Sequence, residues 1–69
     1  MEKVAVASSN VACVGYDEDT HTLEVEFNNG SVYQYSDVPI HVFDELVNAG
    51  SVGSYLHHNI KNIYGCTRV

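Results

Sequence analysis

The sequence predicts an α+β domain in which a three-stranded antiparallel meander is followed by two helices packed on one face of the sheet. Two observations predict this fold. Between residues 11 and 36 apolar side chains recur with a period of two, which is typical of half-buried antiparallel strands. From residue 37 onward they recur at helical spacing, so strands precede helices along the chain. We expect one domain over residues 1–69, with a core that is marginal at this length.

The predicted strands cover residues 11–16, 22–27 and 31–36. The second shows the cleanest alternation, because Leu23, Val25 and Phe27 share one face while threonine and glutamate occupy the other. An Asn-Asn-Gly turn follows it, and the third strand returns antiparallel. These residues therefore predict a hairpin with one apolar face.

The length of that turn decides where two tyrosines point. A two-residue loop puts Tyr33 and Tyr35 on the outer face of the sheet, beside the glutamates. A three-residue loop with Gly30 as a left-handed bulge instead pairs Val25 with Tyr33 and Leu23 with Tyr35. A one-residue slip exchanges the two faces of a strand. We favour the bulge, because it buries two aromatic side chains in a core that is short of volume.

Two helices are expected after the strands. Asp37 and Pro39 mark the start of the first helix, and Asn48-Ala49-Gly50 marks its end. Ser51 is the candidate cap of the second, in which His57 and Lys61 share one edge with a tyrosine, Tyr64. The apolar stripes are expected at Val42, Phe43, Leu46 and Val47 in the first helix and at Val52, Leu56, Ile60 and Ile63 in the second.

The charge of the chain is divided between its two ends. All nine carboxylates fall within residues 1–45, which hold one lysine and carry a formal charge of −8. Residues 46–69 have no acid and carry +2 from Lys61 and Arg68, next to the pair His57 and His58. An anion is therefore expected to bind at the C-terminal end, whereas a long nucleic acid would also meet the acidic half.

Several classes of function are disfavoured by the sequence. No apolar stretch approaches the ~20 residues that span a bilayer, and the opening residues lack the features of a signal peptide, so we expect a soluble cytoplasmic protein. Cys13 and Cys66 are then expected to stay reduced.

A metal site and catalysis are disfavoured as well. Adjacent helical histidines point about 100° apart, which disfavours a metal site at His57 and His58. Neither a nucleophile with an orienting base nor a carboxylate pair stands out, so we expect no enzyme and no cofactor.

Three groups of residues are candidates for ligand contacts, and each has a structural alternative. His57 and His58, with Lys61 and Arg68, contact a phosphate or a base, or they form a solvated helix edge. The start of the second helix, at Ser51, Gly53 and Ser54, offers free N–H groups to a phosphate, or these residues simply cap the helix and relieve crowding. Tyr33 and Tyr35 stack on bases or belong to the core. The candidate ligand-binding residues are Tyr33, Tyr35, Ser51, Gly53, Ser54, His57, His58, Lys61 and Arg68.

Nearly the whole chain resembles the KTSC domain. The residues that carry the resemblance are Ser8-Ser9-x-Val11, Gly15-Tyr16-Asp17, Leu23-x-Val25-x-Phe27-x-x-Gly30-x-x-Tyr33-x-Tyr35-x-x-Val38-Pro39, Ala49-x-Ser51-x-Gly53-x-Tyr55 and Ile60-Lys61-x-x-Tyr64. This domain occurs at the C-terminus of some lysyl-tRNA synthetases and as a free-standing protein in bacteria and their phages. Because the domain accompanies a tRNA synthetase, the resemblance implies that the domain binds RNA. Typical members are more basic along the second helix and tail than this chain.

The sequence as a whole favours a non-enzymatic module that binds or sequesters a phosphate-bearing small nucleotide. A chain this small would build its pocket between subunits, so we expect a homo-oligomer. The phage-borne members of the family add counter-defence as a role, by sequestration of a nucleotide signal. An RNA-binding accessory domain and a protein–protein interaction adaptor remain the alternatives.

Overall fold

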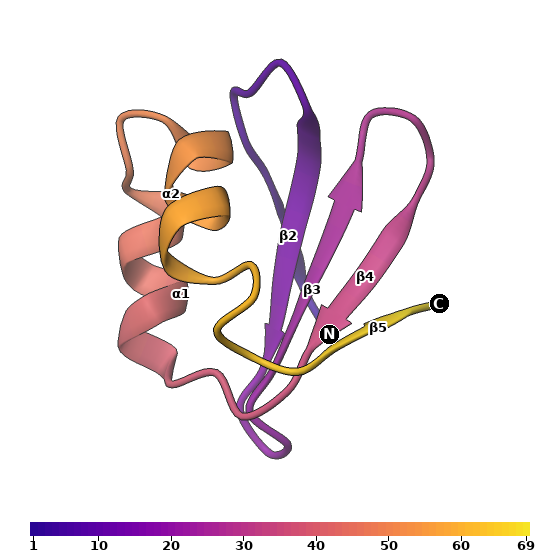
Figure 1. The fold of residues 1–69 in the computed structure, drawn as a ribbon, viewed down its shortest axis with the longest axis vertical. Helices are drawn as coiled ribbons and strands as arrows, with labels where there is room; N and C mark the ends of the chain where they lie inside the picture. Colours follow the sequence, from indigo (N-terminus) through magenta and orange to yellow (C-terminus); the bar gives the residue numbers. More distant parts are fainter.

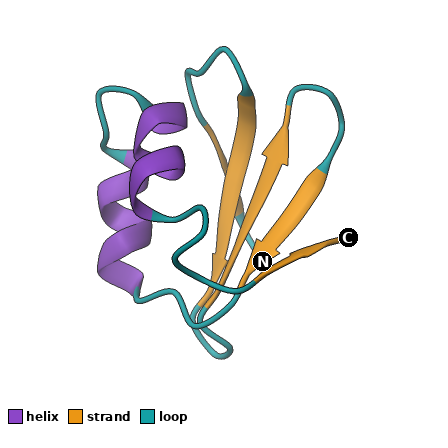
Figure 2. Cartoon of the chain, in the orientation of Figure 1, coloured by secondary structure: helices purple, strands orange, loops and turns teal.

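Five strands and two helices make up the fold, and the computed structural model describes residues 1–69 (Figures 1 and 2). All strands form one antiparallel sheet in the order β1-β2-β3-β4-β5. Both helices lie on the same face of this sheet. The elements are β1 (Lys3–Ala5), β2 (Val11–Asp17), β3 (Thr22–Phe27), β4 (Val32–Tyr35), α1 (Ile40–Val47), α2 (Val52–Asn59) and β5 (Cys66–Arg68).

The expected three-stranded meander is present as β2, β3 and β4, but the sheet has five strands, so that part of the prediction was wrong. The two additional strands are the edges, β1 and β5. Each has only three residues, and all of them are exposed. Strands this short and this exposed have no alternation of apolar and polar residues for a sequence pattern to detect.

The bulged register of the hairpin is confirmed. Gly30 has a φ of 91°, in the left-handed region, and its N–H group donates to the Phe27 carbonyl at 2.9 Å. The Phe27 N–H group donates to Ser31, and Tyr35 is paired with Leu23. Directly paired residues share a face of the sheet. The two β4 tyrosines therefore lie on the apolar, helix-bearing face.

The end of α1 and the start of α2 follow the prediction, whereas the beginning of α1 does not. Pro39 is the residue before the helix and no side chain caps it, while Asp37 has a left-handed φ of 58°, so the expected acidic start was wrong. Asn48 ends α1 as expected. Ser51 caps α2, and its hydroxyl accepts the Ser54 N–H at 3.3 Å.

Helix α2 is shorter than the sequence predicts. It ends at Asn59, the Lys61 N–H group donates to the Leu56 carbonyl at 2.8 Å, and Asn62 turns the chain with a φ of 67°. Ile63 consequently lies outside the helix with 61% of its surface exposed, which contradicts its expected place in the apolar stripe. The early end allows the chain to return to the sheet as β5.

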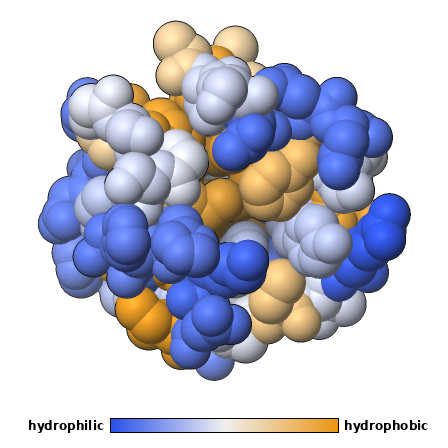
Figure 3. Space-filling view, turned by 45° about the horizontal axis from the view of Figure 1, so that its top comes forward, coloured by the Kyte–Doolittle hydropathy of each residue, from blue (hydrophilic) through white to orange (hydrophobic).

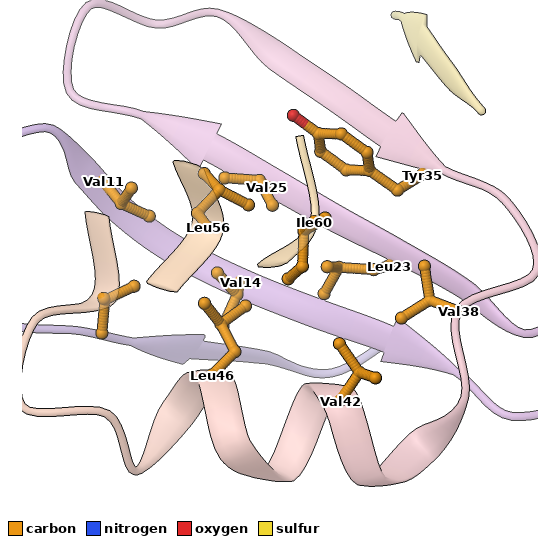
Figure 4. Packing of buried hydrophobic residues seen from close by; sticks show 11 residues of the cluster. Val11, Val14, Leu23, Val25, Tyr35, Val38, Val42, Leu46, Leu56 and Ile60 are labelled. Carbon is orange, nitrogen blue, oxygen red and sulfur yellow. The ribbon is translucent and has the colours of Figure 1, made fainter. Parts of the chain in front are cut away.

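The core lies between the helices and the β2–β3 part of the sheet (Figure 4). Its members come from both layers, and the remaining helix stripe residues Phe43 and Val47 pack against it half-buried. Neither helix has the length and apolarity needed to cross a membrane. The buried set is Val11, Val14, Leu23, Val25, Tyr35, Val38, Val42, Leu46, Val52, Leu56 and Ile60.

The two cysteines are free and lie far apart in the sheet. Cys13 is in β2 and Cys66 is in β5, so β3 and β4 separate them. Three inter-strand spacings amount to about 14 Å. A disulfide needs Cα atoms within about 7 Å, so this fold does not allow the pair to form.

We predict that Gly30→Ala destabilises the protein by about 1 kcal/mol, because alanine disfavours a left-handed φ. A domain of this size should then lose about 4–8 °C in melting temperature. Gly50→Ala is the matched control, since a Cβ there meets no atom within 4 Å and its φ is not left-handed. Equal melting temperatures of the two variants would contradict the bulged turn.

Candidate ligand-binding groove

A groove of about 520 Å³ lies between α2 and the part of the sheet that the helices leave uncovered. We call it the α2 groove. Strands β3, β4 and β5 form one side, while α2 and the segment after it form the other. Figure 3 shows a hollow in this face, with an apolar floor and polar side chains around it. The lining residues are Asn10, Val11, Phe27, Asn29, Ser31, Tyr33, Tyr35, Gly53, Leu56, His57, Lys61, Asn62, Tyr64 and Cys66.

The aromatic side of the groove follows from the hairpin register. Because Tyr33 pairs with Val25, its ring lies on the helix-bearing face, where it meets the Phe27 ring edge-on at 5.6 Å between centroids. Tyr33 is half-buried, so part of its ring remains available to a ligand. Tyr64, on the opposite side, is also half-buried. The groove therefore offers aromatic surface from both the sheet and the segment after α2.

The groove contains no carboxylate, although the protein carries a formal charge of −6. Lys61 and His57 are its basic side chains. Both salt bridges in the protein belong to Lys3, which bonds Glu24 at 2.8 Å, so the Lys61 ammonium group has no carboxylate partner. An anion in the groove would thus meet an unpaired cation and no acid among the lining residues.

Tyr35 links the core to the groove. Only 4% of its surface is exposed, and its cross-strand partner is Cys66. Burial, and then the neighbouring Cys66 thiol, raise the pKa of Tyr35 from 10.0 to about 12. The hydroxyl therefore stays protonated at neutral pH. A thiol is a weak hydrogen-bonding partner, so this hydroxyl keeps capacity to donate to a ligand.

Five of the nine residues expected to bind a ligand come together in this groove. They are contributed by the sheet, by α2 and by the turn after it, and they are Tyr33, Tyr35, Gly53, His57 and Lys61. Gly53 has only the Ser8 hydroxyl near its missing Cβ, at 3.6 Å. Its place in α2 leaves the groove wall without a side chain at that point.

The other four expected residues do not line the groove. The Ser51 hydroxyl is engaged with the backbone N–H of Ser54, which fits the capping alternative. The His58 ring lies edge-on against the His57 ring, with 5.1 Å between centroids. Arg68 lies in the edge strand β5, where it pairs with Tyr33 of β4. No group of three metal-ligating side chains occurs at these positions or elsewhere in the protein.

Sequence reasoning missed the polar residues of the groove, namely Asn10, Asn29, Ser31 and Asn62. They lie in loops that are distant in sequence. Pairing of Val11 with Phe27 brings the start of β2 to the hairpin, and Asn28 reinforces the contact by donating its side-chain amide to the Ser9 carbonyl at 2.9 Å. The one feature of the sequence that could have located some of these residues was this strand pairing, because it follows from the predicted meander.

These features define a small α+β domain with one acid-free aromatic groove. Residues 7–64 match the KTSC domain, and the chain belongs to the KTSC domain family. It is similar to a KTSC domain protein from Yersinia pestis whose crystal structure aligns with a TM-score of 0.92 at 32% identity, covering 99% of this chain and 96% of that one. Membership of the KTSC domain family, expected from the sequence resemblance, is thus confirmed.

In one bacterial relative the matching region is most of a small protein, and in another it is a small part of a large enzyme. A protein of Stutzerimonas stutzeri is 39% identical over 61 residues, which are 88% of this chain and 86% of that protein. A lysine–tRNA ligase of Trichormus variabilis is 52% identical over 46 residues, which are 67% of this chain. The matched part is only 8% of that enzyme.

The pKa of Tyr35 predicts an alkaline loss of stability. The unfolded chain releases this proton near pH 10, whereas the folded protein holds it to about pH 12. The free energy of unfolding should therefore fall as the pH rises from 10 to 12. Urea denaturation across this range measures the fall, and Tyr35→Phe should reduce it. Superimposable pH profiles for the two proteins would show that Tyr35 is not the group responsible.

Proposed function

We propose that this protein is a non-enzymatic module that binds a phosphate-bearing small nucleotide in the α2 groove. One observation carries the proposal. In a protein with a net charge of −6, the groove is free of carboxylates, and Lys61 lies there beside aromatic rings without an ion-pair partner. An aromatic surface next to an unpaired cation suits a planar base attached to a phosphate.

The dimensions and chemistry of the groove support this ligand class. Its volume of about 520 Å³ is within the range of small-ligand sites, which is roughly 300–1,000 Å³. The exposed part of the Tyr33 ring can stack on a base, which contributes about 1–3 kcal/mol per base. Amide side chains at Asn10, Asn29 and Asn62 can donate and accept hydrogen bonds to the edges of that base.

We include self-association in the proposal. The groove is open to solvent on the face shown in Figure 3, whereas small-ligand sites bury most of their ligand. A second copy of the chain placed over the opening would complete the enclosure, and Arg68 at the adjacent sheet edge would add a cation. A closed assembly of this kind suits sequestration of a nucleotide signal, which is the counter-defence role.

RNA binding is the second candidate, because a lysine–tRNA ligase shares 52% identity with 46 residues of this chain. The charge distribution favours a small nucleotide instead. One or two phosphates need few cations, whereas a long strand would also meet carboxylates outside the groove. Binding of transfer RNA that weakens steeply with added salt would favour RNA, and no binding at physiological salt would count against it.

We predict that Lys61→Ala abolishes nucleotide binding and leaves the melting temperature nearly unchanged, because Lys61 is exposed and makes no ion pair. A thermal-shift screen against mono-, di- and cyclic nucleotides is the measurement. A nucleotide at 100 times its dissociation constant should stabilise the parent protein by about 2.7 kcal/mol.

Lys3→Ala is the matched control, since it removes the same charge from the opposite face of the sheet, where Lys3 pairs with Glu24. This variant should bind nucleotides as the parent does. The proposal fails if no nucleotide in the screen raises the melting temperature, or if both lysine variants lose binding equally. Unfolding of Lys61→Ala would mean that Lys61 is structural.

A further inference from the structure

A second, smaller groove lies on the other side of the helix layer, between α1 and the β1 edge of the sheet. We call it the β1 groove. It has a volume of about 250 Å³, and the apolar side chains of Val4, Tyr16, Ile40 and Phe43 line it. Val4 is 41% exposed and Ile40 is 50% exposed. The Tyr16 and Phe43 rings, which both line the groove, stack at 5.4 Å between centroids.

The charge of this groove is opposite to that of the α2 groove. Glu2, Glu18 and Asp44 line it, and no lysine, arginine or histidine does. None of the three carboxylates forms an ion pair. The nearby Lys3 does not neutralise them, because its ammonium group is bound to Glu24 and Glu26 on the other face of the sheet. Exposed apolar side chains are thus bordered by three uncompensated negative charges.

The outer edge of β1 is also unpaired, because β1 is the first strand of the sheet. In an antiparallel pair, hydrogen-bonded residues alternate with residues whose backbone groups point away. The Val6 N–H group donates to the Ala12 carbonyl of β2 at 3.2 Å, so the backbone groups of Val6 point toward β2. By this alternation the backbone groups of Val4, two residues earlier, also point toward β2. The backbone groups of Lys3 and Ala5 therefore point outward and can accept another strand.

We propose that the β1 groove docks an extended, cationic segment of another protein, which adds to β1 as a further strand. Apolar side chains of the segment would pack against Val4 and Ile40, and its lysine or arginine side chains would reach Glu18 and Asp44. Main-chain hydrogen bonds supply affinity in such strand addition, and alternate side chains supply specificity. Charge complementarity selects the cationic partner.

A second copy of this chain is a poor occupant for the same groove. Pairing of two β1 strands about a twofold axis would bring the acidic surfaces of both copies together, including Glu2 and Glu18. Like charges at an interface disfavour association. The chain also carries only three lysine and arginine residues, and the one within β1 is already paired. A basic segment from a different protein has neither disadvantage.

The test uses a fluorescent synthetic peptide with threonine at every second position, and with valine and lysine taking turns at the positions between, so that valine and lysine face the groove together. The same peptide with glutamate in place of lysine is the comparison. Fluorescence anisotropy measures affinity, and amide chemical-shift changes locate the site. We expect the lysine peptide alone to bind, with shifts along β1 and the first turn of α1. Glu18→Gln with Asp44→Asn should weaken binding about fivefold, as two exposed ion pairs would. Ile40→Ser should weaken binding by a similar factor through lost apolar contact.

The control is the double variant Asp19→Asn with Asp37→Asn, which makes the same change in charge at exposed acids outside the groove. It should bind the lysine peptide as the parent does. The proposal is overturned by the absence of binding, by equal losses in both double variants, or by shifts confined to the α2 groove. Concentration-dependent dimerisation through β1 would overturn it in favour of a second copy. Nucleotide binding in the α2 groove is independent of each of these outcomes.

Discussion

The register of the β3–β4 hairpin is the constraint on which the rest of this structure depends. Gly30 adopts a left-handed φ, and the resulting three-residue turn pairs Tyr35 with Leu23. Side chains alternate along a strand, so a slip of one residue would turn Tyr33 and Tyr35 to the other face. The core would lose one of its few large side chains, and the α2 groove would lose its aromatic side.

Two short helices pack on a five-stranded sheet, and the domain has a groove on each side of its helix layer. A helix of eight residues is about 12 Å long, whereas a strand of seven residues is about 23 Å long. Helices α1 and α2 therefore cover only part of the length of the strands, and the two grooves lie beside β1 and beside β4 and β5. The uneven charge of the chain gives these two grooves opposite character. Carboxylates border the β1 groove, while Lys61 lies in the α2 groove.

Much of the fold could be predicted because its signals are local. The period of two located β2, β3 and β4, Ser51 marked the start of α2, and the need to bury aromatic side chains selected the correct register. The edge strands β1 and β5 could not be predicted in this way, because three exposed residues form no pattern. The end of α2 was missed because Asn62, rather than glycine, takes the left-handed conformation there.

The groove was only partly predictable for a related reason. Lys61 and His57 were found from charge and helical spacing, although the helix ends before Lys61 and a turn, not the helix, brings it to the groove. The asparagines come from three separate loops: the pairing of β2 with β3 brings Asn10 to the hairpin that holds Asn29, and the turn after α2 adds Asn62. Ser51 was expected at the site because helix starts bind anions, but its hydroxyl caps the helix. Tertiary arrangement, rather than residue type, decided these cases.

We propose that the acid-free aromatic groove beside α2 is where this domain binds a nucleotide. The most direct measurement is a set of intermolecular nuclear Overhauser effects between the protein and the nucleotide that stabilises it most. The account predicts contacts from base protons to the rings of Tyr33 or Tyr64, with the phosphate close to Lys61. Contacts from the base to Ile40 or Val4, on the opposite side of the helix layer, would contradict it.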